Sequence, residues 1–136
     1  SEAASLALHA TAVMAGAHGE RVTARRMASA LGVSEAHLSK VLQRLTRAGL
    51  VRGTRGPRGG FRLTRPARQI SLREVYEAVE GSLKVEHCLL GVSVCGQMKC
   101  PVAGLFEKLG REAIRVLGKT TLGDFQVSID TQCGGQ

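Results

Sequence analysis

The feature that most limits how this chain can fold is a tight turn between two amphipathic helices in its first half. The second of these helices carries apolar residues three and four positions apart, at Leu38, Val41, Leu42 and Leu45. Its capping residue and the turn before it complete a helix-turn-helix pattern, with Ala28, Leu31, Gly32, Val33 and Ser34. The pattern predicts a small, mainly helical domain with one helix presented outward.

Helical spacing also precedes this pattern, and a hairpin follows it. An apolar face over residues 2–18 predicts a first helix, and Thr23 can cap a second helix that runs to Leu31. Beyond the third helix come two alternating runs, 51–55 and 61–64, separated by residues rich in Gly and Pro. These runs predict a two-stranded wing that packs against the helices.

Two capping boxes predict the next elements. Ser71 and Glu74 open a fourth helix that extends to about Glu80. Thr121 and Asp124 form the second box, which predicts a short final helix or a turn.

A long helix is predicted between the two boxes. Pro101 suits its first position, and its span is 101–118. An apolar stripe runs along it, formed by Val102, Leu105, Phe106, Leu109, Ala113, Val116 and Leu117. The fold class is therefore mainly α with a small β-hairpin wing, a winged helix-turn-helix domain followed by a long C-terminal dimerisation helix.

Four segments follow from this reading. Residues 1–81 form the winged helix-turn-helix domain, and 82–100 form a Cys-rich loop. Residues 101–125 hold the dimerisation helix and the short final helix, and 126–136 form a flexible tail.

Charge is distributed unevenly between the two halves of the chain. Residues 1–70 carry 12 basic and 3 acidic side chains, whereas residues 71–136 carry 7 and 8. The basic half is the candidate for binding double-stranded DNA. No stretch of ~18 apolar residues that could cross a membrane is found. The start, at Ser1, lacks the pattern of a signal peptide, so we expect a cytoplasmic protein. It also lacks a Met, so we expect that a few residues have been removed or left out.

The third helix and the wing supply the candidate DNA contacts. Base readers are expected at the start of the helix, at Ser34, Glu35, His37 and Lys40. Arg44 and Arg47 lie further along the same face and are expected to meet phosphates. The wing contributes Arg52, Arg55 and Arg58, of which Arg58 stands at a tip suited to a minor groove, followed by Arg62, Arg65 and Arg68. The alternative is a solvated basic face without a partner.

Three cysteines, Cys88, Cys95 and Cys100, lie within a Gly-containing stretch. Clustered thiolates bind iron, zinc or iron–sulfur clusters, and Cys100 is expected at the N-cap of the long helix, where unpaired N–H groups favour a thiolate. Zinc, a regulatory disulfide such as Cys88–Cys100, and unrelated free thiols remain alternatives. Cys133 is interpreted as a spare thiol.

With these elements in place, the chain resembles the IscR/NsrR-type family of bacterial winged-helix regulators. The segments that carry the resemblance are 38–42, 48–51, 55–60 followed by Phe61, the three-Cys loop and 121–124. The resemblance implies a homodimer through helix 101–118, a palindromic operator and a [2Fe–2S] or [4Fe–4S] cluster on the three cysteines. It also implies that the cluster senses nitric oxide, redox state or iron–sulfur status.

The chain departs from the family pattern at the cluster site. Six and four residues separate its cysteines where five and five are common, and Ala103 stands where IscR proper has a ligating His. The acidic ligand that NsrR-like relatives take from the partner's first helix aligns with Ser5. His9, one turn later, becomes the candidate fourth ligand from the partner subunit. The alternatives are His87, Glu86, Glu2, Glu107 or a small molecule.

The function predicted from sequence is a homodimeric transcription regulator, a repressor, controlled by an iron–sulfur cluster. A cluster-free regulator switched by thiols or zinc is one alternative, and an iron–sulfur carrier or scaffold with an incidental basic surface is another. No nucleophile–base pair, phosphate loop or paired acid is found in the sequence, so an enzyme is not expected.

Overall fold

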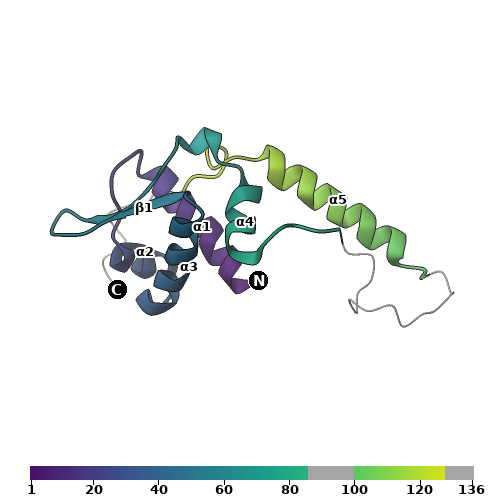
Figure 1. Ribbon diagram of the computed structural model, residues 1–136, viewed down its shortest axis with the longest axis horizontal. Coiled ribbons are helices and arrows are strands. Elements are labelled where there is room, and N and C mark those ends of the chain that lie inside the picture. The colour runs from purple at the N-terminus through teal and green to yellow at the C-terminus, as the bar shows by residue number, and fades with distance from the viewer. Residues whose placement is uncertain (86–99, 128–136) are drawn as a thin grey trace.

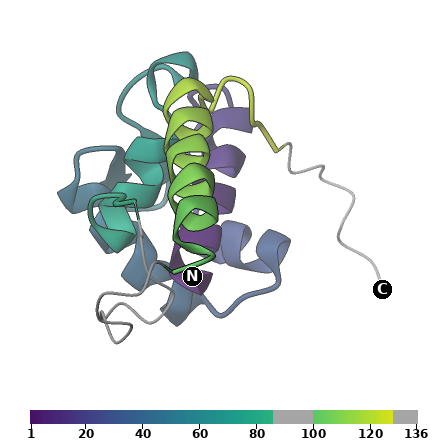
Figure 2. The same ribbon diagram turned by 90° about the vertical axis from the view of Figure 1, so that its right-hand side faces the viewer.

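The computed structural model describes residues 1–85 and 100–127 (Figure 1). Within these residues a helical body carries a two-stranded hairpin on one side, and the last long helix reaches outward on the other (Figures 1 and 2). In chain order the elements are α1 Glu2–Gly16, α2 Ala24–Leu31, α3 Glu35–Arg47, β1 Val51–Thr54, β2 Gly60–Leu63, the 3-10 turn η1 Ala67–Gln69, α4 Leu72–Glu80 and α5 Ala103–Lys119. The predicted fold class is confirmed.

Helix α1 lies at the centre of the body. Small side chains such as Ala7 and Ala10 are fully buried in it, which lets neighbouring helices approach closely. The hydroxyl of Thr11 is also buried, and it donates to the carbonyl of Ala7 at 2.8 Å, so burial leaves it satisfied. The helix ends at Gly16, two residues before the predicted end, because the chain turns there through His18 and Gly19 at positive φ.

The helix-turn-helix forms as the sequence predicts. The hydroxyls of Thr23 and Ser34 cap α2 and α3 by accepting hydrogen bonds from the N–H groups of Arg26 and His37, both at 3.1 Å. Gly32 ends α2 in the left-handed region with φ of 67°, where a side chain would be strained. The two helices pack through Met27 and Leu38, which are fully buried.

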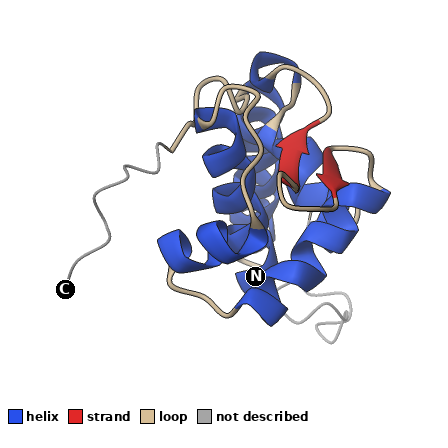
Figure 3. Cartoon of the chain, turned by 90° about the vertical axis from the view of Figure 1, so that its left-hand side faces the viewer, coloured by secondary structure: helices blue, strands red, loops and turns tan. Residues whose placement is uncertain are grey.

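The wing is an antiparallel hairpin in which Val51 pairs with Leu63 and Thr54 with Gly60 (Figure 3). Val22 adds one more rung, since it exchanges two backbone hydrogen bonds with Phe61 at 2.8 and 2.9 Å. The turn at the tip leaves no room for a side chain at Gly59. A Cβ at that position would lie 2.3 Å from the carbonyl oxygen of Thr54. The turn formers of the sequence therefore meet a steric requirement at this turn.

The chain returns to the body after α5. Leu122 is fully buried, and its N–H donates to the carbonyl of Ile70 at 2.9 Å. Beside it, the N–H of Leu72 donates to the carbonyl of Thr120 at 2.9 Å. Thr121 and Asp124 pair as a cap and close a turn, which is the second of the two outcomes predicted for this box, in place of a short final helix.

Helix α5 presents two apolar faces. Phe106, Ile114 and Leu117 are partly covered, and the segment after α4 lies against the helix at Gly110, where a Cβ would be 3.5 Å from Val85. The second face is open, with Val102, Leu105, Leu109 and Val116 exposed by 37%, 54%, 54% and 43%. None of the residues of α5 is fully buried. The helix therefore leaves an apolar strip uncovered within the described part of a single chain.

Candidate nucleic-acid interface and cysteine site

Helix α3 exposes the side opposite its buried stripe. The residues on this side are Ala36, Lys40, Gln43 and Arg47, all exposed. The stripe itself is packed into the body, since Leu38, Val41, Leu42 and Leu45 are 0–2% exposed. A helix anchored so firmly on one side can offer a polar face to a groove without itself moving.

His37 and Arg44 lie on a neighbouring face of α3. His37 Nδ1 is 3.8 Å from Glu2 Oε1 at the start of α1. Arg44 Nη1 donates to the carbonyl of Val79 in α4 at 3.1 Å. The structure thus separates His37 and Arg44 from Lys40 and Arg47, although the sequence predicted one shared face. The cause is the position of α1 and α4, which cover one flank of the helix.

Gln43 also lies on the outer face, between Lys40 and Arg47, and was not among the DNA contacts predicted from the sequence. Its position opposite the apolar stripe could have identified it, but it is uncharged and the prediction rested mainly on cations. An amide can pair with the edge of adenine in a major groove. Ser34 and Glu35 both stand exposed at the start of α3, where the Ser34 oxygen serves as the cap.

A groove of about 470 Å³ separates α3 from the wing. Ser39 and Thr46 line it from the helix, and Gly53 and Phe61 line it from the strands. Gly53 leaves room for the ring of Phe61, because a Cβ at position 53 would lie only 3.0 Å from that ring. The outer face of α3 and the wing therefore flank one depression.

Most of the predicted wing cations are exposed, whereas Arg62 is half-buried. Arg52, Arg55 and Arg58 all reach solvent, and Arg58 lies at the tip. Arg21, in the segment before α2, donates from Nη1 to the carbonyl of Arg58 at 3.1 Å. This contact ties the tip to the segment before α2 and adds one more cation beside it.

Cys100 is a free, half-buried thiol that precedes α5. The helix begins at Ala103 with Val102 as its N-cap, so the predictions that Cys100 caps it and that Pro101 opens it are wrong by two residues. The difference arises because residues 101 and 102 form a turn, in which the N–H of Ala103 donates to the carbonyl of Cys100 at 3.3 Å. Cys88, Cys95 and Cys133 lie outside the described residues.

His9 is exposed on α1, and its Nδ1 lies 2.7 Å from the carbonyl oxygen of Ser5. A carbonyl only accepts, so Nδ1 donates in this contact and Nε2 takes no part in it. The ring packs edge-on against Phe125 with centroids 5.9 Å apart. Of the other fourth-ligand candidates, Glu107 pairs with Arg111 and Glu2 lies by His37, while Glu86 and His87 lie outside the described residues.

The described side chains do not by themselves assemble a metal site. Within residues 1–85 and 100–127 there is no cluster of three or more His, Cys, Asp or Glu side chains placed to hold a metal ion. The same residues contain no helix that is both long enough and apolar enough to span a membrane.

Comparison with known proteins agrees with this arrangement. Residues 1–127 match the family Rrf2, described as "Iron-dependent Transcriptional regulator". The chain is 44% identical to protein aau3 of Rhizobium meliloti over 87 residues, which are 63% of this chain and 54% of that protein. It is 34% identical to the transcriptional regulator IscR of Cereibacter sphaeroides over 108 residues, which are 77% of this chain and 70% of that protein. The chain thus spans about half to two thirds of the length of these relatives.

Solved structures give the same result. IscR of T. potens superposes with a TM-score of 0.71 and 28% identity, covering 91% of this chain and 82% of that one. CymR of B. subtilis, described as the global cysteine regulator, superposes with a TM-score of 0.71 and 23% identity, and this likeness shows the fold. Members of this family are transcription regulators and not enzymes. The chain belongs to the Rrf2 family of winged-helix transcription regulators.

Proposed function

We propose that this protein is a homodimeric, operator-binding repressor whose DNA affinity is set by an iron–sulfur cluster on Cys88, Cys95 and Cys100. The observation that carries the proposal is the joining of two surfaces in one chain. The basic outer face of α3 lies beside a basic wing, and α5 leaves an apolar strip uncovered. The first surface suits DNA, and the second suits a second copy of the chain.

The uncovered strip of α5 supports dimerisation. Val102, Leu105, Leu109 and Val116 recur at helical spacing over about four turns. Pairing two such helices would place two recognition helices in a fixed relation, and successive major grooves on one side of DNA are ~34 Å apart. A palindromic operator then follows from the symmetry of the dimer.

A chain of contacts supports communication between α5 and the recognition helix. Arg44 joins α3 to the end of α4 through the carbonyl of Val79, and Leu72 joins the start of α4 to the end of α5 through Thr120. Helix α4 therefore contacts both the recognition helix α3 and the end of α5. A shift of α5 against the body would be transmitted to the angle at which α3 is presented.

The donor set fits an iron–sulfur cluster. Cys100 forms no disulfide within the described residues and is half-buried just before α5, and three cysteines in thirteen residues are the ligand type such clusters take. When bound, a cluster supplies a centre whose charge and integrity respond to oxidants, nitric oxide or iron–sulfur status. The free Nε2 of His9 on α1 supports the proposal that the partner subunit's first helix supplies the fourth ligand.

The experiment is anaerobic purification with iron and sulfide assays, a visible absorption spectrum and DNA binding of the loaded and stripped forms. We expect Cys88→Ala, Cys95→Ala and Cys100→Ala each to abolish the cluster absorption, and Cys133→Ala to retain it as the matched control. His9→Ala should shift the spectrum without removing all iron.

Loaded and stripped protein should differ in operator affinity by about tenfold or more, because coupling free energies of 1–3 kcal/mol are typical. Equal affinities would refute the coupling. Iron-free protein that binds DNA and cannot be reconstituted would instead support a thiol- or zinc-based switch. Iron-loaded protein that binds no DNA would support a carrier.

A further inference from the structure

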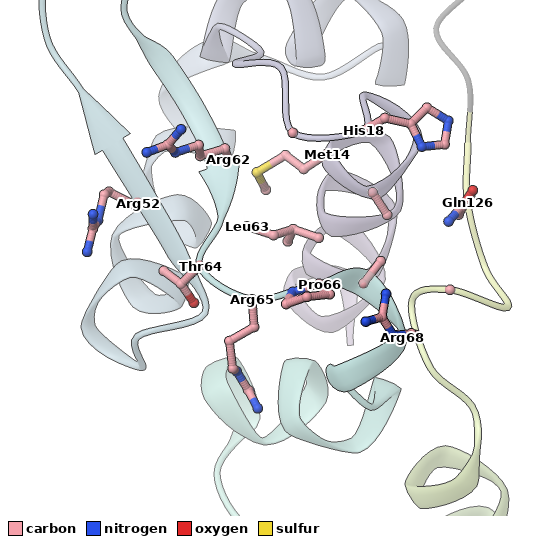
Figure 4. Close-up of a pocket in the computed structure, with 14 residues that line it drawn as sticks. Met14, His18, Arg52, Arg62, Leu63, Thr64, Arg65, Pro66, Arg68 and Gln126 are labelled. Atoms are coloured by element: carbon pink, nitrogen blue, oxygen red, sulfur yellow. The ribbon is translucent and has the colours of Figure 1, made fainter.

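A second cavity, of about 650 Å³, lies where four segments of the chain meet (Figure 4). The end of α1 contributes Met14 and His18, the wing contributes Arg52 and Arg62, and the C-terminal return contributes Gln126. The segment around η1 closes the remaining side. The function proposed above gives this cavity no role.

The cavity shares no lining residue with the groove between α3 and the wing. Arg52 and Arg62 are paired across the hairpin, so their side chains project from the same face. Their neighbours Gly53 and Phe61 line the groove against α3, and neither of them lines this cavity. A DNA phosphate held between α3 and the wing would therefore not fill the second cavity.

The lining is strongly cationic. None of its fourteen residues is acidic, and four are arginines. Arg65 is already engaged, because its Nη2 lies 2.7 Å from Glu74 Oε1 and its Nη1 donates to the carbonyl of Gln69. Arg52, Arg62 and Arg68 have no carboxylate partner within the described residues. Three guanidinium groups thus border one cavity without a counter-charge from the described part of the chain.

The floor of the cavity is apolar. Met14 and Leu63 lie at its centre, with Pro66 beside them (Figure 4). Sites for small ligands commonly measure about 300–1,000 Å³ and combine an apolar lining with a few polar groups that fix orientation. The guanidinium fork matches the two oxygens of a carboxylate or phosphate.

We propose that this cavity binds a small organic anion in which a phosphate or carboxylate group is attached to an apolar body. The oxyanion would lie beside Arg68, and the apolar body would lie on Met14 and Leu63, while Arg52 and Arg62 line the cavity on the side away from Arg68 (Figure 4). A DNA backbone offers phosphate without that apolar body.

Such a ligand would act as a second input to the regulator, and this consequence rests on the function proposed above. Bound between the wing and Gln126, it would connect the wing to the segment that follows α5. Gly123 lets that segment approach closely, because a Cβ there would lie 3.2 Å from Arg68 Cα. The wing and the dimerisation helix would then respond to one bound molecule.

The test is isothermal titration of the full chain with phenyl phosphate, benzoate and inorganic phosphate. We expect phenyl phosphate or benzoate to bind more tightly than inorganic phosphate, and the tighter of the two identifies the oxyanion. Arg68→Gln should weaken that binding by about tenfold through loss of one charge-assisted hydrogen bond. Arg25→Gln, which removes one exposed charge on α2, should change it by less than twofold.

Three outcomes would overturn the proposal. One is the absence of binding of either organic probe at 10 mM, a concentration chosen on the order of the weakest useful affinities. Another is equal weakening by Arg68→Gln and Arg25→Gln, which would indicate only general surface charge. The last concerns binding of a random-sequence DNA duplex. If Arg68→Gln reduces the slope of log affinity against log salt concentration by about 0.9, Arg68 contacts a DNA phosphate and the cavity is part of the DNA interface. Because titration needs no operator, its result is independent of whether the proposed repression holds.

Discussion

At the scale of single residues, the neighbours of a cation decide what it does. Lys40 is exposed on the outer face of α3, whereas the guanidinium of Arg44 is held by the carbonyl of Val79. Both carry one positive charge on the same helix, four residues apart. They form a matched pair for separating a DNA contact from a structural one.

We expect Lys40→Gln to weaken DNA binding by about tenfold with little effect on unfolding, since a contact to DNA is worth about 1–3 kcal/mol. Arg44→Gln should instead lower the free energy of unfolding by about 1 kcal/mol, because the Val79 carbonyl loses its charged donor. Fluorescence anisotropy and urea unfolding measure the two effects. The reverse pattern would show that Arg44 turns from α4 to bind DNA.

Glu74 gives a pH-dependent contribution to stability. Its partial burial favours the neutral acid, but hydrogen bonds from the Ser71 backbone N–H and from Arg65 outweigh this and lower its pKa below the usual 4.5. The carboxylate therefore stabilises the fold above pH 4.5, and this contribution is lost as the pH falls through the lower pKa of the folded state.

We expect Glu74→Gln to reduce the free energy of unfolding by about 0.5–1 kcal/mol at pH 7, a value kept small because the side chain is 42% exposed. The difference from the wild type should shrink as the pH falls below 4.5 and through the lower pKa of the folded state, because the carboxylate then protonates. Urea unfolding across pH 3–8, a range on the order of the carboxyl titration, measures this. Exposed Glu20→Gln serves as the control, and a difference that persists at low pH would contradict the account.

At the scale of elements, α5 stands apart from the other helices. Its two apolar faces need two partners, and the described part of the chain partly covers one of them. The open face carries Leu105 and Leu109, each 54% exposed. Leaving these leucines in water is unfavourable by ~25 cal/mol per Å² of apolar surface, which is a driving force for association.

We expect the double substitution Leu105→Gln with Leu109→Gln to give a monomer, measured by analytical ultracentrifugation. Helix content by circular dichroism should stay within about a tenth of the wild type, since Gln forms helices nearly as well as Leu. Lys108→Gln, on the same helix, should leave the dimer intact. A dimer that survives the double substitution would mean that another surface joins the subunits.

At the scale of the whole molecule, the return of the chain after α5 connects the two ends of the fold. Leu122 fills the core beside Ile70, and Val127 donates from its N–H to the carbonyl of Ala12 at 3.0 Å. This segment holds the C-terminal end of α5 against α1 and α4. Its loss would weaken the body and the attachment of α5 together.

We expect Leu122→Ala to lower the free energy of unfolding by about 2–4 kcal/mol, the range for emptying a fully buried leucine site. Leu31→Ala, the same change at a half-buried position of α2, should cost less. Thermal unfolding followed by circular dichroism compares the two variants. Equal losses would show that the return segment is not part of the cooperative core.

The elements that could be predicted are those whose signals are local. Caps at Thr23, Ser34 and Ser71 form as expected because each hydroxyl reaches a backbone N–H within three residues. The hairpin follows from turn residues that the tip requires sterically at Gly59. The end of α1 and the start of α5 were displaced by two residues, since helix ends depend on how the following chain leaves.

What the sequence by itself determined was the order of the elements, the winged helix-turn-helix class and the family, because periodicity, caps and turn chemistry act over a few residues. What only the tertiary structure decided was which side chains of those elements remain available. Arg44 is held by α4, Arg65 is paired with Glu74, and Arg62 and Arg68 line one cavity although they lie on separate elements. These outcomes depend on how the helices pack, and packing joins residues that no local spacing brings together.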